Sequence, residues 1–450
     1  MKKEELSDVL EFIDDPVIDE VYKARNTNRR QKHRKLTRYI ASAACFCVIV
    51  TSLFFTVPLF NVAHAQDLME GISPNPVEPI ALDAFNENVT DFAIRLFKAS
   101  QTDGQNSLVS PLSVMCALSM TLNGADGETK AQMEAVLGMS VEELNNYIYS
   151  YINSLPVKNK YKLTVANSIW LDEDGGFVPN RDFLQTNADY YGADIYKTQF
   201  DSKTVNQIND WISRETEGMI PKMLDYIPPE TMVLLINSIA FRADWSDIYV
   251  ENEIHDGVFT LENGTEKEVK LMYDNDLRTY FGSDNCIGFV KNYVGNKYAF
   301  AAILPDEGIN MSDFLETLTG EKISEMLANQ QKGIVRTRIP KFKTEFNVDL
   351  ENALVEMGMT DAFSQSNADF GLMGSSPDNF FIDSVLHKTF IEVNERGTRA
   401  GAATYIPTLG IDTVNPNDVK IYLDRPFVYM LIDLDTNTPF FIGTMMNPEI

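Results

Sequence analysis

Apolar side chains recur along this chain with two periods, one typical of helices and the other typical of strands. Residues 113–122 and 128–137 predict two helices, and the Gly-containing segment 123–127 predicts the turn between them. The helical period is clearest in a segment that we expect to open the main body of the chain, at Phe85, Val89, Phe92, Ala93, Leu96 and Phe97.

Strand signals dominate the later part of the chain. Residues 162–171 and 232–241 are apolar and rich in β-branched side chains, which is typical of buried strands. Residues 427–434 and 439–444 predict a terminal hairpin that turns at Asp435-Thr436-Asn437. Helices near the start followed by strands indicate an α+β fold.

The longest uncharged segment lies before this body. Residues 39–65 contain no Asp, Glu, Lys or Arg, and residues 41–60 are apolar over a length that can cross a bilayer core of about 30 Å as a helix. The basic residues 29–38 lie directly before it, so the positive-inside rule predicts a cytoplasmic N-terminus and an external body. Ala63-His64-Ala65 has the form of a signal-peptide cleavage site, so an anchor and a long signal peptide both stay open.

These features divide the chain into four predicted parts. The third part is interpreted as a semi-rigid linker, because it contains Pro74, Pro76 and Pro79 and few periodic apolar positions. The body is expected outside the cytoplasm, either held at the membrane by the second part or secreted. The parts are a cytoplasmic segment (1–38), a signal anchor or signal peptide (39–65), the linker (66–82) and a domain (83–450).

Charge and cysteine content exclude several classes of partner. The net charge is −27, and the excess acid lies in the body, which would repel the phosphates of a nucleic acid. Cys45 and Cys47 lie in the apolar segment, which leaves Cys116 and Cys286 as isolated thiols that we expect to be buried. Two isolated cysteines form neither a disulfide framework nor a metal site. We therefore expect no nucleic-acid partner, no metal and no other cofactor.

The catalytic motifs of common hydrolases are missing from the body. From residue 64 onward the histidines are His64, His255 and His387, so a hydrolytic triad has few candidate bases. The sequence contains no Gly-x-Ser-x-Gly, no His-Glu-x-x-His and no phosphate-binding Gly-rich loop. A membrane-tethered hydrolase is therefore a disfavoured alternative, and no catalytic residue is predicted.

A run of small residues near the C-terminus is the most informative segment. Residues 395–404 read Glu-Arg-Gly-Thr-Arg-Ala-Gly-Ala-Ala-Thr, and they precede residues 405–416, which contain two prolines and no helical period. A merely flexible linker would carry Ser or Gly in place of most of these side chains. Small residues that still adopt strand geometry suit a segment that must enter an existing sheet.

This run resembles the reactive-loop hinge of inhibitory serpins, the serine protease inhibitors whose cleaved loop inserts into a sheet. Other segments are similar to serpin motifs in the same order, so the resemblance covers roughly residues 82–450. The matching segments are Asn106–Ser113, Leu122–Ala125, Asn237–Trp245, Leu304–Gly308, Ile339–Phe342, His387-Lys388, Arg425–Phe427 and Phe441–Pro448.

The resemblance implies a serpin fold, with helices packed around a large central mixed sheet and an exposed reactive loop. It implies an irreversible suicide-substrate inhibitor of serine proteases, with those proteases as covalent partners and the chain itself a monomer. The alternative is a non-inhibitory serpin-fold binding module on the cell surface. The hinge positions that match the family are Glu395, Gly397, Thr398, Ala400, Ala402, Ala403 and Thr404.

Strand alternation predicts which hinge side chains face the core. If Thr398 faces the core on insertion, then Ala400, Ala402 and Thr404 face it too, and all four are small. Arg399 stands where the family usually has an acid, but it belongs to the outward set. We therefore interpret the hinge as competent for inhibition.

Family spacing from Glu395 places the attacked bond between Ile411 and Asp412. An aliphatic Ile411 suits an elastase-like or subtilisin-like protease, and residues 405–419 contain no Arg or Lys to attract a trypsin-like one. The loop is several residues longer after this bond than in many relatives. The alternatives for the attacked residue are Leu409, Thr413 and Val414.

Five further residues resemble those that control loop insertion in the family. The resemblance implies that four of them form a buried polar cluster beneath the opening of the sheet, and that Trp245 packs where the loop enters. The four cluster residues are Ser110, Ser113, Asn237 and His387.

Overall fold

The computed structural model describes residues 65–155, 161–173, 176–229, 231–377, 379–398 and 418–449. The predicted cytoplasmic segment and almost all of the predicted membrane segment lie outside these residues. Among the described residues, no helix is long and apolar enough to cross a membrane.

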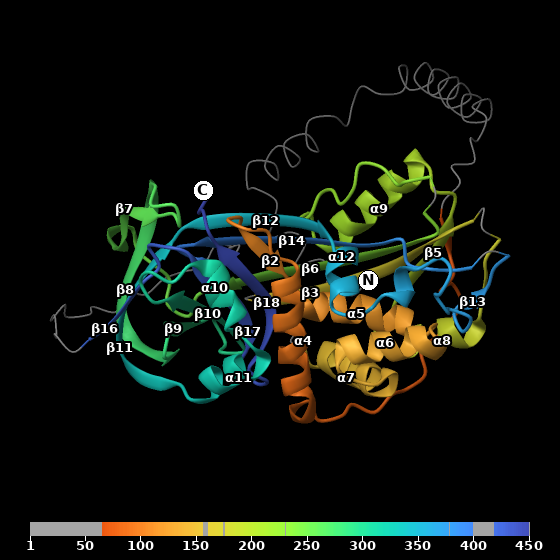
Figure 1. Cartoon of the computed structure of the whole chain (residues 1–450), viewed down its shortest axis with the longest axis horizontal. Coiled ribbons are helices and arrows are strands. Elements are labelled where there is room, and N and C mark those ends of the chain that lie inside the picture. The colour runs from red at the N-terminus through yellow and green to blue at the C-terminus, as the bar shows by residue number, and fades with distance from the viewer. Residues whose placement is uncertain are drawn as a thin grey trace, which may run out of the picture. The chain divides into compact units, whose positions relative to one another are not determined.

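Most of the helices belong to the first half of the described chain, as the sequence predicts. In Figure 1, α9 lies on one side of the long central strands and α5 to α8 lie on the other side. The described α-helices are α4 (Asn86–Ala99), α5 (Pro111–Leu122), α6 (Gly127–Leu137), α7 (Val141–Ser154), α8 (Arg181–Tyr191), α9 (Ser202–Glu215), α10 (Met311–Glu316), α11 (Gly320–Ala328) and α12 (Glu351–Glu356).

A mixed sheet of seven strands passes through the centre of the described chain (Figure 1). Its strands follow the order β1-β5-β3-β6-β15-β14-β12, with additional pairing between β6 and β14. Their bounds are β1 Gln66–Asp67, β5 Asp194–Thr198, β3 Tyr161–Asp172, β6 Val233–Asp244, β15 Gly397–Thr398, β14 Ser384–Asn394 and β12 Phe342–Asp349.

A second sheet packs beside the first, and a two-stranded pair of β4 (Val178–Pro179) and β13 (Gly374–Ser375) completes the described strands. The order in the second sheet is β16-β11-β8-β9-β10-β17-β18-β2, and β7 pairs with β8. Its strands are β16 Val419–Tyr422, β11 Gln331–Pro340, β8 Glu266–Ser283, β9 Cys286–Asn292, β10 Tyr298–Pro305, β17 Phe427–Asp433, β18 Thr438–Met445, β2 Ser107–Val109 and β7 Ile254–Thr260.

The strands predicted from apolar runs are confirmed. β3 and β6 pair antiparallel with Asn167 opposite Asn237, and β17 and β18 form the terminal hairpin. The hairpin turn contains Asn437, whose φ of 54° is a conformation that Asn tolerates better than most residues. Every residue of β17 and β18 is buried, which explains why this segment is apolar without alternation.

The helix α5 lies in the core beneath both sheets, and all of its residues are buried. It begins after Ser110, whose hydroxyl accepts a hydrogen bond from the Ser113 N–H, and Pro111 occupies the first helical position. Cys116 lies on this helix, and Cys286 begins β9. Both are buried free thiols, as predicted.

Residues 66–82, which we predict to be a semi-rigid linker, contact the domain. The first of these residues form β1, which pairs with β5, and Asn75 donates from its backbone and side chain to Asp189 at 2.7 and 3.0 Å. Leu68, Met69 and Ile72 pack against the core. Three apolar side chains and an added strand attach this segment to the domain, although it lacks a helical or strand period.

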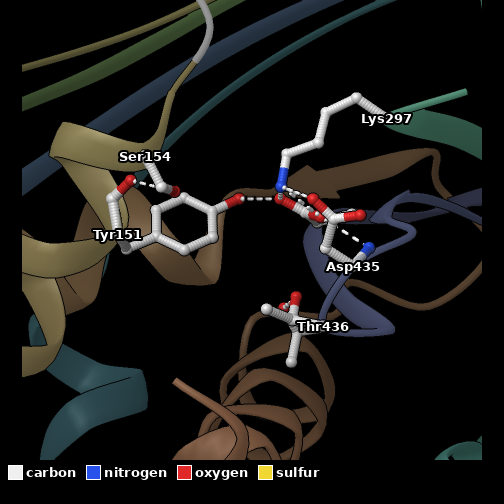
Figure 2. A network of polar contacts seen from close by, with 7 residues as sticks. Tyr151, Ser154, Lys297, Asp435 and Thr436 are labelled. Carbon is white, nitrogen blue, oxygen red and sulfur yellow. Dashed lines mark hydrogen bonds and ion pairs between the residues drawn. The ribbon is translucent and has the colours of Figure 1, made fainter. Parts of the chain in front are cut away.

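A buried carboxylate of the terminal hairpin forms an ion pair with Lys297 and a hydrogen bond with the end of α7 (Figure 2). The Asp433 carboxylate is fully buried, accepts a hydrogen bond from the Tyr151 hydroxyl at 3.1 Å and lies 2.9 Å from the Lys297 ammonium. Lys297 also contacts Asp435 at 2.7 Å. Burial alone would lower the pKa of Lys297, but the two carboxylates raise it above its usual value.

Candidate functional site

The hinge begins where β14 ends, and its first residues already occupy the central sheet. After Asn394 the chain turns back, so that Gly397 and Thr398 pair antiparallel with both β14 and β6. Thr398 lies opposite Val393 on one side and opposite Ala243 on the other. The start of the hinge therefore lies between β6 and β14 in the uncleaved chain.

Thr398 faces the interior of the molecule. Its side chain is 1% exposed, and its hydroxyl lies 2.5 Å from the hydroxyl of Tyr293. This is the orientation from which strand alternation places positions 400, 402 and 404 on the same inward face. Ala400, Ala402, Ala403 and Thr404 lie outside the described residues, as do Ile411 and Asp412.

Gly397 is required by its close approach to β6. Its φ is +150°, and a Cβ at this position would lie 2.1 Å from the carbonyl oxygen of Ala243. Any other residue would displace the chain from the sheet at this point.

Three consecutive carbonyl groups hold the turn at the start of the hinge against Trp245 and Tyr249. The Trp245 indole Nε1 donates to Asn394, the Tyr249 N–H donates to Glu395 and the Trp245 N–H donates to Arg396, at 2.8 to 2.9 Å. Trp245 is buried and stacks on Tyr293, with 4.6 Å between the ring centroids. Trp245 therefore packs against the turn that joins β14 to β15.

Glu395 adds an ion pair to this anchor. Its carboxylate lies 2.7 Å from the Lys341 ammonium. Burial would raise the pKa of Glu395, but the hydrogen bond and charge of Lys341 hold it below its usual value. The carboxylate is therefore charged at neutral pH and ties the hinge to the residue before β12.

A buried lysine beside Trp245 was not predicted from the sequence. Lys291 on β9 is fully buried, lies 2.9 Å from Asp274 and has its ammonium 4.4 Å from the centre of the Tyr249 ring. Burial lowers the pKa of Lys291 well below its usual value. The available signal was a lysine inside the apolar run of residues 286–291.

The predicted polar cluster lies where β6 and β14 meet the start of α5. His387 Nε2 accepts a hydrogen bond from the Ser110 N–H at 3.0 Å, so the proton of the neutral ring is on Nδ1. That Nδ1–H donates to Asn237 at 2.6 Å, and Asn237 donates in turn to Asn167 at 2.8 Å. Burial lowers the pKa of His387 to about 3, so the ring is neutral under ordinary conditions.

Ser110 and Ser113 contribute differently to this cluster. The Ser110 hydroxyl donates to the Phe440 carbonyl at 2.8 Å. The Ser113 hydroxyl is buried without a hydrogen-bond partner in the described part of the chain, and this residue contributes its backbone N–H instead. The structure thus brings together Ser110, Asn237 and His387, while Ser113 takes part only through the helix start.

The two central strands are joined at one end and separated at the other. β6 and β14 pair in parallel from Leu234 opposite Ser384 to Ser238 opposite Lys388. In the described chain no ladder pairing joins residues 239–242 of β6 to residues 389–392 of β14, and β15 separates the strands beyond them. The outer edges of the two strands stay paired with β3 and β12. The sheet therefore has a gap one strand wide, open toward the hinge.

The described residues contain no group of three or more His, Cys, Asp or Glu side chains able to hold a metal ion. The central sheet has an unoccupied strand position between β6 and β14, and the first residues of the hinge have begun to enter it.

This chain belongs to the serpin family. The family model described as Serpin (serine protease inhibitor) matches residues 87–448. Serpin B6 of Pongo abelii is 31% identical over 383 residues, which cover 82% of this chain and 100% of the relative. The leukocyte elastase inhibitor of Xenopus laevis is 31% identical over 377 residues, covering 80% of this chain and 98% of the relative.

Solved structures agree with this assignment. The thermophilic serpin tengpin in its native state is 46% identical, with a TM-score of 0.82, and the match covers 85% of this chain and 100% of tengpin. Tengpin in its latent state is 44% identical, with a TM-score of 0.72 over 84% of this chain. The predicted α+β serpin fold is confirmed, and no catalytic family is indicated.

Proposed function

We propose that this protein is an irreversible suicide-substrate inhibitor of serine proteases. The observation that carries the proposal is the gap between β6 and β14, with Thr398 already placed at its entrance. Unpaired strand edges favour the entry of a further strand, because each entering residue can form ladder hydrogen bonds with both neighbours.

The register of Thr398 predicts how the loop would enter. Continued from Ala243 and Val393, it places residues 399–402 opposite 242–239 of β6 and 392–389 of β14. These residues would fill the gap without breaking an existing strand pair. Thr404 would then arrive between Asn237 and His387, whose hydrogen bond must break for insertion to proceed.

Cleavage would supply the freedom that this movement needs. The protease serine oxygen attacks the carbonyl carbon of Ile411, an ester to that oxygen forms, and the bond to the Asp412 nitrogen breaks. The amine of Asp412 leaves with a proton from the general base of the protease. The chain before residue 411 then inserts while still esterified, carrying the protease away from the site of attack before water can hydrolyse the ester.

The proposed attacked bond, between Ile411 and Asp412, indicates the class of protease that is inhibited. Ile411 is aliphatic, which suits the apolar pockets of elastase-like and subtilisin-like proteases. The similarity to a leukocyte elastase inhibitor supports the same class. Leu409, Thr413 and Val414 remain alternative attacked residues.

Incubation with elastase and with subtilisin tests this function. We expect a complex that survives SDS and a released peptide that begins at Asp412, both identified by mass spectrometry. Clean cleavage of the loop with no SDS-stable complex would favour the non-inhibitory binding module instead.

The cellular location and the oligomeric state of the inhibitor are a separate proposal. We propose that the body acts outside the cytoplasm as a monomer, either anchored through residues 39–65 or released after Ala65. The support is the apolar segment and the basic residues before it. N-terminal sequencing of the mature protein decides between the two forms, and light scattering measures its mass in solution.

A further inference from the structure

The closed end of the gap between β6 and β14 is held by a side chain as well as by backbone pairing. Asp383 directly precedes β14, and its Oδ2 accepts hydrogen bonds from the Met232 N–H at 2.7 Å and the Val233 N–H at 2.9 Å. The Asp383 N–H donates to the Val233 carbonyl at 3.3 Å. We call Asp383 with Met232 and Val233 the aspartate clasp.

The aspartate clasp lies across the path of the inserting strand. Continuing the register of Thr398 by ten residues brings the strand to the level of Val233 on one side and Asp383 on the other. A strand that extends this far separates Asp383 from Met232 and Val233. Both hydrogen bonds to the carboxylate must then break.

We propose that Asp383 is a positioning residue that slows the last part of strand insertion by holding the closed ends of β6 and β14 together. This inference rests on the proposed function, because it concerns a step of the same insertion. Hydrogen bonds to a carboxylate are stronger than those to a neutral acceptor, so the charge of Asp383 contributes to the barrier.

A neighbouring aspartate provides a matched control. Asp349 accepts hydrogen bonds from the Ser384 hydroxyl and from the Val385 N–H, and it thereby joins β12 to β14. Insertion between β6 and β14 leaves β12 and β14 paired. Asp349→Asn therefore removes the same kind of charge from the same end of β14 without changing a contact between β6 and β14.

The environment of Asp383 disfavours its charged form relative to water. Burial raises the pKa of Asp383 above its usual value, although the N–H groups of Val233 and Met232 oppose this effect. Glu351 on α12 lies near both aspartates, and its pKa is raised by burial and by the charges of Asp349 and Asp383. The N–H groups of Met232 and Val233 offset part of this burial, and insertion removes them from the carboxylate.

The test compares the wild type, Asp383→Asn and Asp349→Asn after mixing each with subtilisin. The insertion rate is followed by tryptophan fluorescence, to which Trp245 beside the hinge contributes, and by the ratio of SDS-stable complex to cleaved chain. We expect Asp383→Asn to insert roughly tenfold faster than the wild type and Asp349→Asn to match the wild type.

The outcomes separate this inference from the proposed function. If the wild type forms no complex and shows no insertion, the proposed function fails. If the wild type inserts but Asp383→Asn inserts at the same rate, or both variants accelerate equally, the clasp has no specific role. Should Asp383→Asn fail to fold, Asp383→Glu, which keeps the charge but moves the carboxylate away from the two N–H groups, takes its place, and a wild-type insertion rate in that variant overturns the inference.

Discussion

Replacing Thr398 by arginine places a charge in the part of the hinge that already lies in the sheet. Thr398 is 1% exposed, and its hydroxyl contacts Tyr293. A guanidinium at this position loses its hydration and has no acidic partner among the residues that Thr398 contacts. The effective cost of burying an unpaired ion is several kcal/mol.

This cost exceeds what β15 contributes. Its two residues form a short run of backbone hydrogen bonds, each worth about 1 kcal/mol net. Thr398→Arg is therefore expected to leave the sheet in the uncleaved chain and to resist re-entry after cleavage. If about 2 to 3 kcal/mol of the cost is felt in the transition state, insertion slows by roughly 30- to 150-fold.

The assay is the fraction of inhibitor that forms an SDS-stable complex with subtilisin. Slower insertion gives water time to hydrolyse the ester, so Thr398→Arg should be cleaved as a substrate with little complex. Thr398→Ser keeps a small side chain and a hydroxyl, and it should behave like the wild type. An unchanged complex fraction in Thr398→Arg would refute the claim that this side chain enters the interior on insertion.

Three further changes test other parts of the structure. His387 binds a proton in the unfolded chain below about pH 6.5 but in the folded protein only near pH 3. The free energy of unfolding should therefore fall by about 1.4 kcal/mol for each pH unit below 6.5. Urea unfolding from pH 7 to 4.5 should show this slope, and His387→Gln should reduce it. Lys297→Met leaves the Asp433 carboxylate buried without its cation and should lower the free energy of unfolding by about 3 kcal/mol; a loss below 1 kcal/mol would show that the pair is not needed. Gly397→Ala should force the hinge from β6, seen as faster deuterium exchange at the Thr398 amide, and unchanged exchange would contradict the close contact with Ala243.

Local sequence patterns predicted the elements whose burial is regular. The apolar period before Ala99 located α4, and the uninterrupted apolar runs located β6 and β17, because these elements are buried along a whole face or on both faces. From the sequence, an inward-facing Thr398 was only an assumption about the inserted loop, from which the alternation of the following residues was predicted. The structure adds that the residue is already inside the sheet.

Features that depend on distant partners could not be predicted in the same way. β1 is a polar pair of residues whose pairing with β5 uses backbone groups, so no side-chain pattern marks it. Lys291 and Asp383 look like ordinary charged residues until the fold brings Asp274 to the first and the N–H groups of Met232 and Val233 to the second. Residue type alone does not reveal such partners.

The central claim is that the cleaved loop becomes a strand between β6 and β14. A crystal structure of the chain after cleavage in the loop tests it most directly. We expect residues 399–404 to extend β15 along both strands, with Thr404 between Asn237 and His387 and the hydrogen bond between those two side chains broken. A cleaved chain that keeps the Asn237–His387 hydrogen bond and has no new strand beyond Thr398 would contradict the account.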